Sequence, residues 1–259
     1  MTGSHGPSSP IDFRFRFWII LALYLLGFFA PWQRYFAQFR GPRLWSWLAL
    51  ELFSTNRVTS QQAFVLVLAA AIALAIAGAV LRVWGTAYLG SETVTAGAMR
   101  AAEVVADGPY RFLRNPLYVG MWLTGAAVSI LMPWTGGLFF IVALAAFSLR
   151  LIAVEERYLT AQRGEAYRAY RANVGRPLPK FTSPLPASGV KPQWLRSLAG
   201  ESYPVGIAVC LAALGWNYDA SLLTRCVMIC FGASLVMRAV VQPQQNVGRG
   251  VELPASQKN

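Results

Sequence analysis

Residues 62–88 read QAFVLVLAAAIALAIAGAVLRVWGTAY, an apolar run in which Arg82 is the only charged residue. A helix needs about 20 predominantly apolar residues to cross the hydrocarbon core of a bilayer, so this run predicts a spanning helix. Ala71, Ala75 and Ala79 recur every four residues. Side chains at this spacing share one helix face, and small residues there allow a second helix to approach closely. We therefore predict a membrane helix that packs along its alanine face.

The composition extends this prediction to the whole chain. Of 259 residues, 56% are hydrophobic and only 13% are charged, with a mean hydropathy of +0.44. A soluble domain carries about 25% charged residues. The fold class that we predict is all-α, a polytopic membrane helical bundle of about five to six transmembrane helices. The other predicted spans are 15–30, 116–132, 136–154, 203–218 and 221–241, and a shorter run at 44–53 predicts an interfacial or re-entrant helix.

Changes in composition along the chain suggest six regions. The tails contain many Gly, Ser, Pro and polar residues, and the stretch 181–202 contains several Pro and Ser residues. The regions are a disordered N-terminal tail (1–14), an N-terminal membrane helix with an interfacial segment (15–61), a core (62–180), a linker or gating loop (181–202), a C-terminal helical hairpin (203–241) and a C-terminal tail (242–259).

The positive charge has a membrane explanation. The formal net charge is +12, but the basic residues lie between apolar segments and form no single patch, which argues against nucleic acid as a partner. Residues 155–202 contain eight Lys and Arg residues, whereas the opposite side of the predicted bundle carries Arg34, Arg40, Arg43 and Arg57. Cytoplasmic loops are enriched in Lys and Arg, so the side with 155–202 is expected to face the cytoplasm. Arg82 and Arg150 lie close to this side and are expected to extend toward the interface.

The positions of the cysteine and histidine residues limit the kinds of site that the chain can form. Cys210, Cys226 and Cys230 all lie in apolar segments, so we expect them to be small packing residues and predict no metal site. The only histidine is His5, in the N-terminal tail. This position argues against a mechanism that depends on a histidine base. No Rossmann fingerprint, P-loop or zinc-ligand spacing is present.

The stretch 108–120, GPYRFLRNPLYVG, places polar groups at the start of an apolar segment. Arg111 and Arg114 are three residues apart and can hold a carboxylate or a phosphate. Pro116 suits the first position of a helix, which makes Asn115 the N-cap. The unpaired N–H groups at a helix start also attract anions. We therefore predict a polar binding site here.

A pair of acidic residues, Glu155 and Glu156, ends a later apolar segment. Acidic groups at a helix C-terminus oppose the helix dipole, so a cationic partner should lie close by. Arg111, Arg114 and Arg157 can supply that partner, and a positively charged ligand is the alternative.

A polar and mostly helical segment, 155–174, follows this pair. Its arginines suit an anionic membrane surface. It also carries a weak apolar stripe, formed by Leu159, Tyr167, Tyr170 and Val174.

Several motifs together resemble one family, that of the isoprenylcysteine carboxyl methyltransferases and phospholipid methyltransferases. The resemblance covers about residues 80–180, and the order and spacing of the motifs make it more specific than any one of them. The motifs are LRVWG (81–85), LG (89–90), VVADGPYR (104–111), RNPLYVG (114–120), EE (155–156) and GEAYRAY (164–170).

The resemblance implies a membrane enzyme that uses S-adenosyl-L-methionine without a Rossmann domain and has a cofactor pocket on the cytoplasmic side. The implied cofactor contacts are Ala102, Glu103, Val104, Val105, Tyr110, Asn115, Pro116, Leu117, Tyr118 and Glu155. The implied catalytic or substrate-orienting residues are Arg114, Arg150 and Glu156. The family often has histidine where this chain has Asn115, which can form hydrogen bonds but carries no charge.

The expected function is methyl transfer to a lipophilic small molecule or lipid-modified substrate, in contact with membrane lipids. The acceptor stays open between a prenylcysteine-like carboxylate, a lipid amine and another hydrophobic small molecule. Two alternatives come from other functional classes. One is an NADPH-dependent membrane reductase, because sterol reductases show a similar Arg-x-Pro-x-Tyr-x-Gly pattern. The other is a non-enzymatic small transporter or scaffold.

Overall fold

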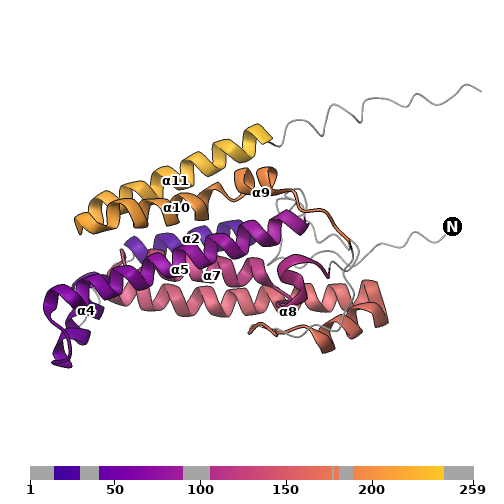
Figure 1. Cartoon of the computed structure of the whole chain (residues 1–259), viewed down its shortest axis with the longest axis horizontal. Coiled ribbons are helices and arrows are strands. Elements are labelled where there is room, and N and C mark those ends of the chain that lie inside the picture. Colours follow the sequence, from indigo (N-terminus) through magenta and orange to yellow (C-terminus); the bar gives the residue numbers. More distant parts are fainter. Residues whose placement is uncertain (1–14, 30–40, 90–105, 177, 181–188, 242–259) are drawn as a thin grey trace, which may run out of the picture.

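The computed structural model describes residues 15–29, 41–89, 106–176, 178–180 and 189–241, with side chains up to residue 237. Both expected tails, and the expected cofactor contacts at 102–105, lie outside these ranges. Every named element in the described ranges is a helix, and the only β-type pairing found there is two isolated bridges. The prediction of an all-α fold is confirmed. Most helices run along the long axis of the molecule, as Figure 1 shows.

Three helices are long and apolar enough to cross a bilayer, and a bent pair makes up to four. The three are α5 (Ser60–Leu89), α8 (Trp134–Asn173) and α11 (Ala220–Val241). The bent pair is α9 (Trp194–Gly200) with α10 (Ser202–Leu214) and the 3-10 turn η3 (Gly215–Asn217), bent by 75°. Two further helices occupy predicted spans, α2 (Arg16–Phe29) and α7 (Pro116–Ser129), and each has 14 residues in the described part of the chain. Fourteen residues rise about 21 Å, less than the roughly 30 Å hydrocarbon core.

Helices α5 and α7 approach closely through small residues. Ala71, Ala75 and Ala79 are buried, which confirms the predicted alanine face. One turn is closest: a Cβ on Gly78 would lie 2.8 Å from the Gly120 carbonyl oxygen, and a Cβ on Gly120 would lie 2.9 Å from the Gly78 carbonyl oxygen. Only residues without a side chain let the two backbones come this near. This contact fixes the axial position of α7 relative to α5.

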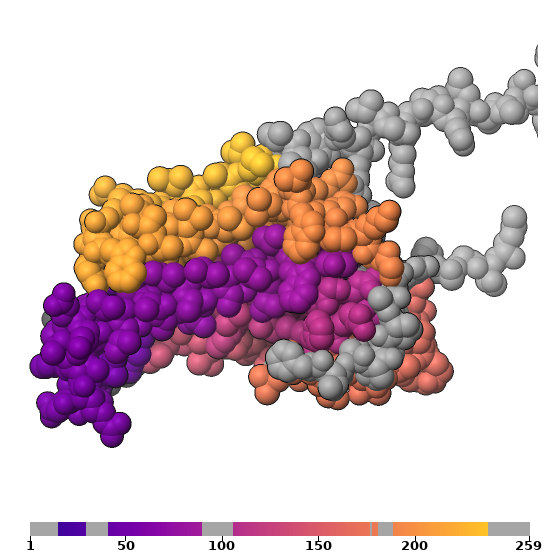
Figure 2. All heavy atoms as spheres, in the orientation of Figure 1, coloured from indigo at the N-terminus to yellow at the C-terminus, as the bar shows by residue number. Residues whose placement is uncertain are grey.

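The remaining helices surround this pair. Helix α4 (Leu44–Ser54) lies across one end of the bundle, where the backbone N–H of Leu44 donates to Met132 O (2.9 Å) and that of Trp45 to Ile130 O (3.0 Å). These bonds attach α4 to the turn between α7 and α8. Helices α10 and α11 form a separate layer over α5, visible in orange and yellow above the purple of α5 in Figure 2.

Helix α8 is longer than the predicted span and contains a break. Gly164 has φ 54° and ψ −127°, a conformation that belongs to no helix. Positive φ is readily adopted only by glycine, so the chain can change direction here. Past the break, Tyr167, Tyr170 and Val174 pack with Ala106 and with Leu159. The predicted apolar stripe is confirmed, and it packs inside the protein.

Part of the region expected to be a linker or gating loop is helical. Helix α9 lies against α5, where the Ser197 hydroxyl donates to Val83 O (2.6 Å). The Gln193 backbone N–H donates to Ala87 O (2.9 Å). Ser197 is buried. These bonds hold residues 193–200 on the end of α5 that also carries the candidate site.

The close approach of α5 and α7 gives a stability prediction. Gly78→Ala places a Cβ about 2.5 Å from Thr124 Oγ1 and 2.8 Å from Gly120 O, so we expect overpacking that lowers the free energy of unfolding by about 1–3 kcal/mol. The matched control is Gly232→Ala in α11, where nothing lies within 4 Å of the new Cβ. Thermal unfolding in detergent, followed by tryptophan fluorescence, should show a loss for the first variant only. Equal melting temperatures for the two variants would contradict this packing.

Candidate active site

The GPYR stretch forms a 3-10 turn, η2 (Gly108–Arg111), as the Gly-Pro pair predicts. Gly108 has φ +55°, and a side chain there would collide with the ring of Tyr88. Backbone bonds then pair the stretch with a later segment: the N–H of Arg114 donates to Gly175 O (3.0 Å) and that of Lys180 to Phe112 O (2.9 Å). The motif is therefore held between the end of α5 and the backbone of Gly175 and Lys180.

Asn115 lies at the N-cap of α7 and Pro116 begins the helix, as predicted. The Asn115 side chain makes no cap hydrogen bond. Its Nδ2 instead donates to Oε1 of Glu156 over 3.2 Å, across a sequence separation of 41 residues. The two motifs of the sequence therefore come into direct contact.

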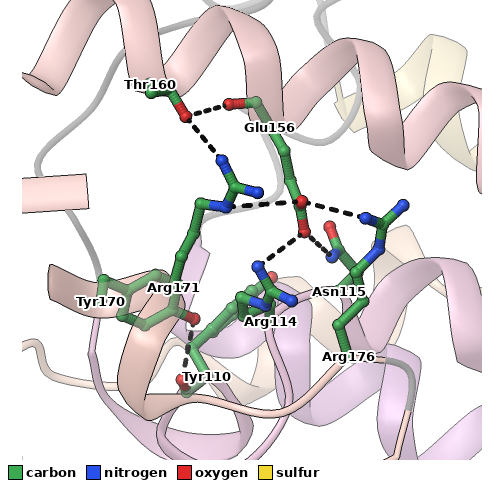
Figure 3. A network of polar contacts seen from close by, with 8 residues as sticks. All are labelled: Tyr110, Arg114, Asn115, Glu156, Thr160, Tyr170, Arg171 and Arg176. Atoms are coloured by element: carbon green, nitrogen blue, oxygen red, sulfur yellow. Dashed lines mark hydrogen bonds and ion pairs between the residues drawn. The ribbon is translucent and has the colours of Figure 1, made fainter. Parts of the chain in front are cut away.

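The Glu156 carboxylate is the centre of this site (Figure 3). Its side chain is only 3% exposed and has three arginine partners. The nitrogen–oxygen distances are 3.3 Å to Arg114, 3.8 Å to Arg171 and 3.3 Å to Arg176. Three arginines around one carboxylate leave these four groups with a net charge of +2. Nε of Arg114 is also buried and has no hydrogen-bond partner among the described residues. The cluster can therefore attract an additional anionic group.

The break at Gly164 brings Arg171 to Glu156. Nη1 of Arg171 lies 3.4 Å from Oγ1 of Thr160, a residue on the preceding turns of α8. The Tyr170 hydroxyl donates to the carbonyl oxygen of Tyr110 over 2.8 Å. A straight helix would separate Thr160 and Arg171 by about 16 Å along its axis. The folded-back end of α8 therefore closes over the motif at 110–115.

Glu155 has a different environment from its neighbour. It is partly exposed, and its carboxylate interacts with the Tyr118 hydroxyl of α7 and with Arg16 of α2. Consecutive residues point about 100° apart on a helix, so Glu155 and Glu156 face different partners. Glu155 is therefore the more exposed glutamate of the pair.

Tyr110 carries a buried hydroxyl without a partner. The residue is 8% exposed, and its hydroxyl has no hydrogen-bond partner in the described part of the chain. Burial raises the pKa of Tyr110 well above its usual value, and the negative charge of Glu155 raises this pKa further. The phenol is therefore a neutral hydrogen-bond donor throughout the neutral pH range. A buried polar group without a partner is costly, and a bound ligand could satisfy this one.

The other expected site residues are placed as follows. Pro116 is buried, and Leu117 and Tyr118 are partly exposed in the first turn of α7. Arg150 is exposed and lies six residues before Glu156, on a different side of α8. Ala102, Glu103, Val104 and Val105 lie outside the described residues.

One polar contact was missed by the sequence analysis. Arg82 does not extend toward the interface as expected, because Glu201 binds it in the interior. Nε and Nη2 of Arg82 lie 2.6 Å and 3.0 Å from the two carboxylate oxygens of Glu201, and the Thr86 hydroxyl donates to the same carboxylate over 2.7 Å. Glu201 lies at the junction of α9 and α10, within the region expected to be a linker. The only indication of its role in the sequence is that it is an acidic residue next to an apolar segment.

A surface hollow elsewhere on the molecule is separate from this site. Its lining includes Phe28, Leu131 and Pro133. Leu131 and Pro133 follow the C-terminal end of α7, whereas Asn115 lies at the N-terminal end. The length of α7 therefore separates the hollow from the Glu156 cluster.

Removing the Glu156 carboxylate should disrupt the folded-back end of α8. Glu156→Ala leaves three arginines around a buried site without their anion, and the loss of one partner of a buried ion pair costs about 3–5 kcal/mol. Limited trypsin digestion should cleave this variant faster after Arg168 or Arg171. The control is Glu165→Ala, which removes an exposed pair with Arg168 and should leave the wild-type cleavage rate unchanged. Equal cleavage of Glu156→Ala and wild type would show that Glu156 does not anchor this segment.

Comparison with known proteins concerns the middle of the chain. The family model described as phospholipid methyltransferase matches residues 66–166. Protein-S-isoprenylcysteine O-methyltransferase of Schizosaccharomyces pombe is 32% identical over 77 residues, which are 29% of this chain and 33% of that protein. The chain therefore matches about one third of the length of that relative. No solved structure matches.

These matches agree with the geometry. The matched region contains η2, the start of α7 and the Glu155–Glu156 pair, which are the parts that meet at the site. The family resemblance of the motifs is confirmed: residues 66–166 match the phospholipid methyltransferase family model.

Proposed function

We propose that this protein is an integral membrane methyltransferase that moves a methyl group from S-adenosyl-L-methionine to a lipophilic acceptor. The observation that carries the proposal is the meeting of Asn115 and Glu156, 41 residues apart, within the region that matches the methyltransferase family. The positive charge of residues 155–202 supports a site that faces the cytoplasm.

The residues present suit the donor chemically. The donor carries a sulfonium, an ammonium and a carboxylate group, and when bound it supplies an electrophilic methyl group. Glu155, which is less buried than Glu156, offers a carboxylate for the cationic groups. The excess positive charge around Glu156 suits the donor's carboxylate, as do the free N–H groups at the start of α7. The unpartnered Tyr110 hydroxyl adds a hydrogen-bond donor.

The chain's contribution to methyl transfer is binding, orientation and exclusion of water. A carboxylate acceptor, such as that of a prenylcysteine, needs no general base, so the lack of histidine in the described helices is compatible with the reaction. A lipid amine would lose its proton to Glu155 or to solvent. Another hydrophobic small molecule with an ionised nucleophile fits the same description. The apolar exterior of the bundle suits entry of the acceptor from the bilayer.

Ligand-induced thermal stabilisation tests the donor. S-adenosylhomocysteine should raise the melting temperature of the detergent-solubilised protein, because a ligand that binds only the folded state stabilises it. NADPH should have no effect. Stabilisation by NADPH alone would replace the methyltransferase proposal with a reductase. Incubation with labelled S-adenosylmethionine and a lipid extract, followed by mass spectrometry, would then identify the acceptor.

Glu155→Gln provides the matching site test. Loss of the carboxylate should weaken S-adenosylhomocysteine binding by about tenfold or more, the scale of a hydrogen bond to a charged group, with little change in the melting temperature of the free protein. Glu51→Gln is the control, because Glu51 is exposed on α4 at the other end of the bundle. Wild-type affinity in Glu155→Gln would show that the donor site lies elsewhere.

Tyr110→Phe should separate binding from folding. The change removes a buried hydroxyl that has no partner, so the free protein should be as stable as wild type or slightly more stable. Affinity for S-adenosylhomocysteine should fall about three- to tenfold, equivalent to one neutral hydrogen bond. Because the pKa of Tyr110 is raised, the difference between variant and wild type should be independent of pH below about 10. Tyr218→Phe, at an exposed turn, is the control, and equal effects of the two changes would contradict this role for Tyr110.

A further inference from the structure

The Arg82–Glu201 pair connects the region that matches the family model with a part of the chain beyond it. Arg82 lies within the matched region 66–166, and Glu201 lies beyond it, between α9 and α10. Glu201 is only 2% exposed, and the partners of its carboxylate in the described chain, Arg82 and Thr86, both lie on α5. This carboxylate therefore fixes the α9–α10 junction on the inner face of α5.

The same guanidinium also reaches the candidate site. Nη1 of Arg82 donates to the carbonyl oxygen of Leu117 over 3.2 Å. Leu117 is the second residue of α7, between Pro116 and Tyr118. The aliphatic part of Arg82 lies against Gly120, where a Cβ would be 2.6 Å from Cγ of the arginine. Arg82 therefore contacts the first turn of α7 both through its charge and through its stem.

The three hydrogen bonds that Arg82 donates require the planar guanidinium of arginine. Two N–H groups bind the two oxygens of Glu201, and a third N–H, on a different nitrogen, binds Leu117. Lysine has one nitrogen and cannot reproduce this planar arrangement. A buried ion pair adds little stability over apolar residues of the same size, so stability alone does not explain it. The distinctive effect of the Arg82–Glu201 pair is that it holds the Leu117 carbonyl of α7 in a fixed position.

We propose that Arg82 and Glu201 are positioning residues of the active site: through the Leu117 carbonyl they fix the first turn of α7, which carries Asn115 and Tyr118. Helices α9 and α10, which lie beyond the matched region, thereby support the start of α7 within it. This inference rests on the proposed function for its effect on binding, and on the geometry alone for its effect on α7. Glu201 and Arg82 also act electrostatically on Tyr110, which agrees with their closeness to the site.

The test uses three variants of the full chain in detergent. Arg82→Lys keeps the charge and removes the fork, and Arg57→Lys is the same change at an exposed position in the turn before α5. The double variant Arg82→Met, Glu201→Met replaces the pair with apolar residues of similar size, a change that buried ion pairs often tolerate without loss of stability. Two measurements are made on each: hydrogen–deuterium exchange at residues 118–121 and affinity for S-adenosylhomocysteine.

Arg82→Lys and the double variant should exchange about tenfold faster at 118–121 and bind S-adenosylhomocysteine about tenfold more weakly, the scale of one hydrogen bond from a charged group. The melting temperature of the double variant should stay near that of wild type, and Arg57→Lys should match wild type in every measurement. Unchanged exchange and affinity in Arg82→Lys would overturn the inference, whether or not the double variant folds. If wild type binds no S-adenosylhomocysteine, the proposed function fails, and the exchange measurement still decides whether Arg82 positions α7.

Discussion

The arrangement of the site depends on one buried carboxylate, that of Glu156. A carboxylate in a mostly apolar bundle is stable only if cationic or hydrogen-bonding groups surround it. Glu156 obtains these groups from three parts of the chain: Arg114 and Asn115 before α7, Arg171 past the break in α8, and Arg176 beyond that helix. Because these partners are distant in sequence, the requirement to neutralise one charge brings separate segments to one end of the bundle. Glu155, one residue earlier, stays partly exposed.

Local patterns in the sequence predicted much of the fold. The alanine spacing of α5, the proline at the start of α7, and the stripe of Leu159, Tyr167 and Tyr170 are each a property of a few neighbouring residues, and each has the predicted counterpart in the structure. A contact between Arg114 and the Glu155–Glu156 pair was one of the alternatives that the sequence left open, because acidic residues at a helix end oppose the helix dipole. The structure assigns that contact to Glu156.

The features that the sequence did not predict depend on where the chain bends and which segments the bend brings together. The path past Gly164 sets which arginines reach Glu156, and no local pattern distinguishes Arg171 or Arg176 from the other arginines of that segment. Glu201 lies between two short helices, in a stretch whose composition resembles a loop, so its partnership with Arg82 depends on a 75° bend that composition does not encode. Charged residues with specific long-range partners are therefore the part of this site that only three-dimensional structure reveals.

The short length of α7 has a consequence for how the protein enters the membrane. With 14 residues and a rise of about 21 Å, this helix is too short to cross roughly 30 Å of hydrocarbon alone. Its glycine and threonine residues pack against α5, and only four residues join it to α8. These two neighbours therefore hold α7 in place where contact with lipid alone would not. During synthesis α5 emerges first and α8 follows directly, so both long neighbours flank the short helix in the order of translation. Integration of α7 into the bilayer is thus a property of a three-helix unit and cannot be assigned to its own hydrophobicity.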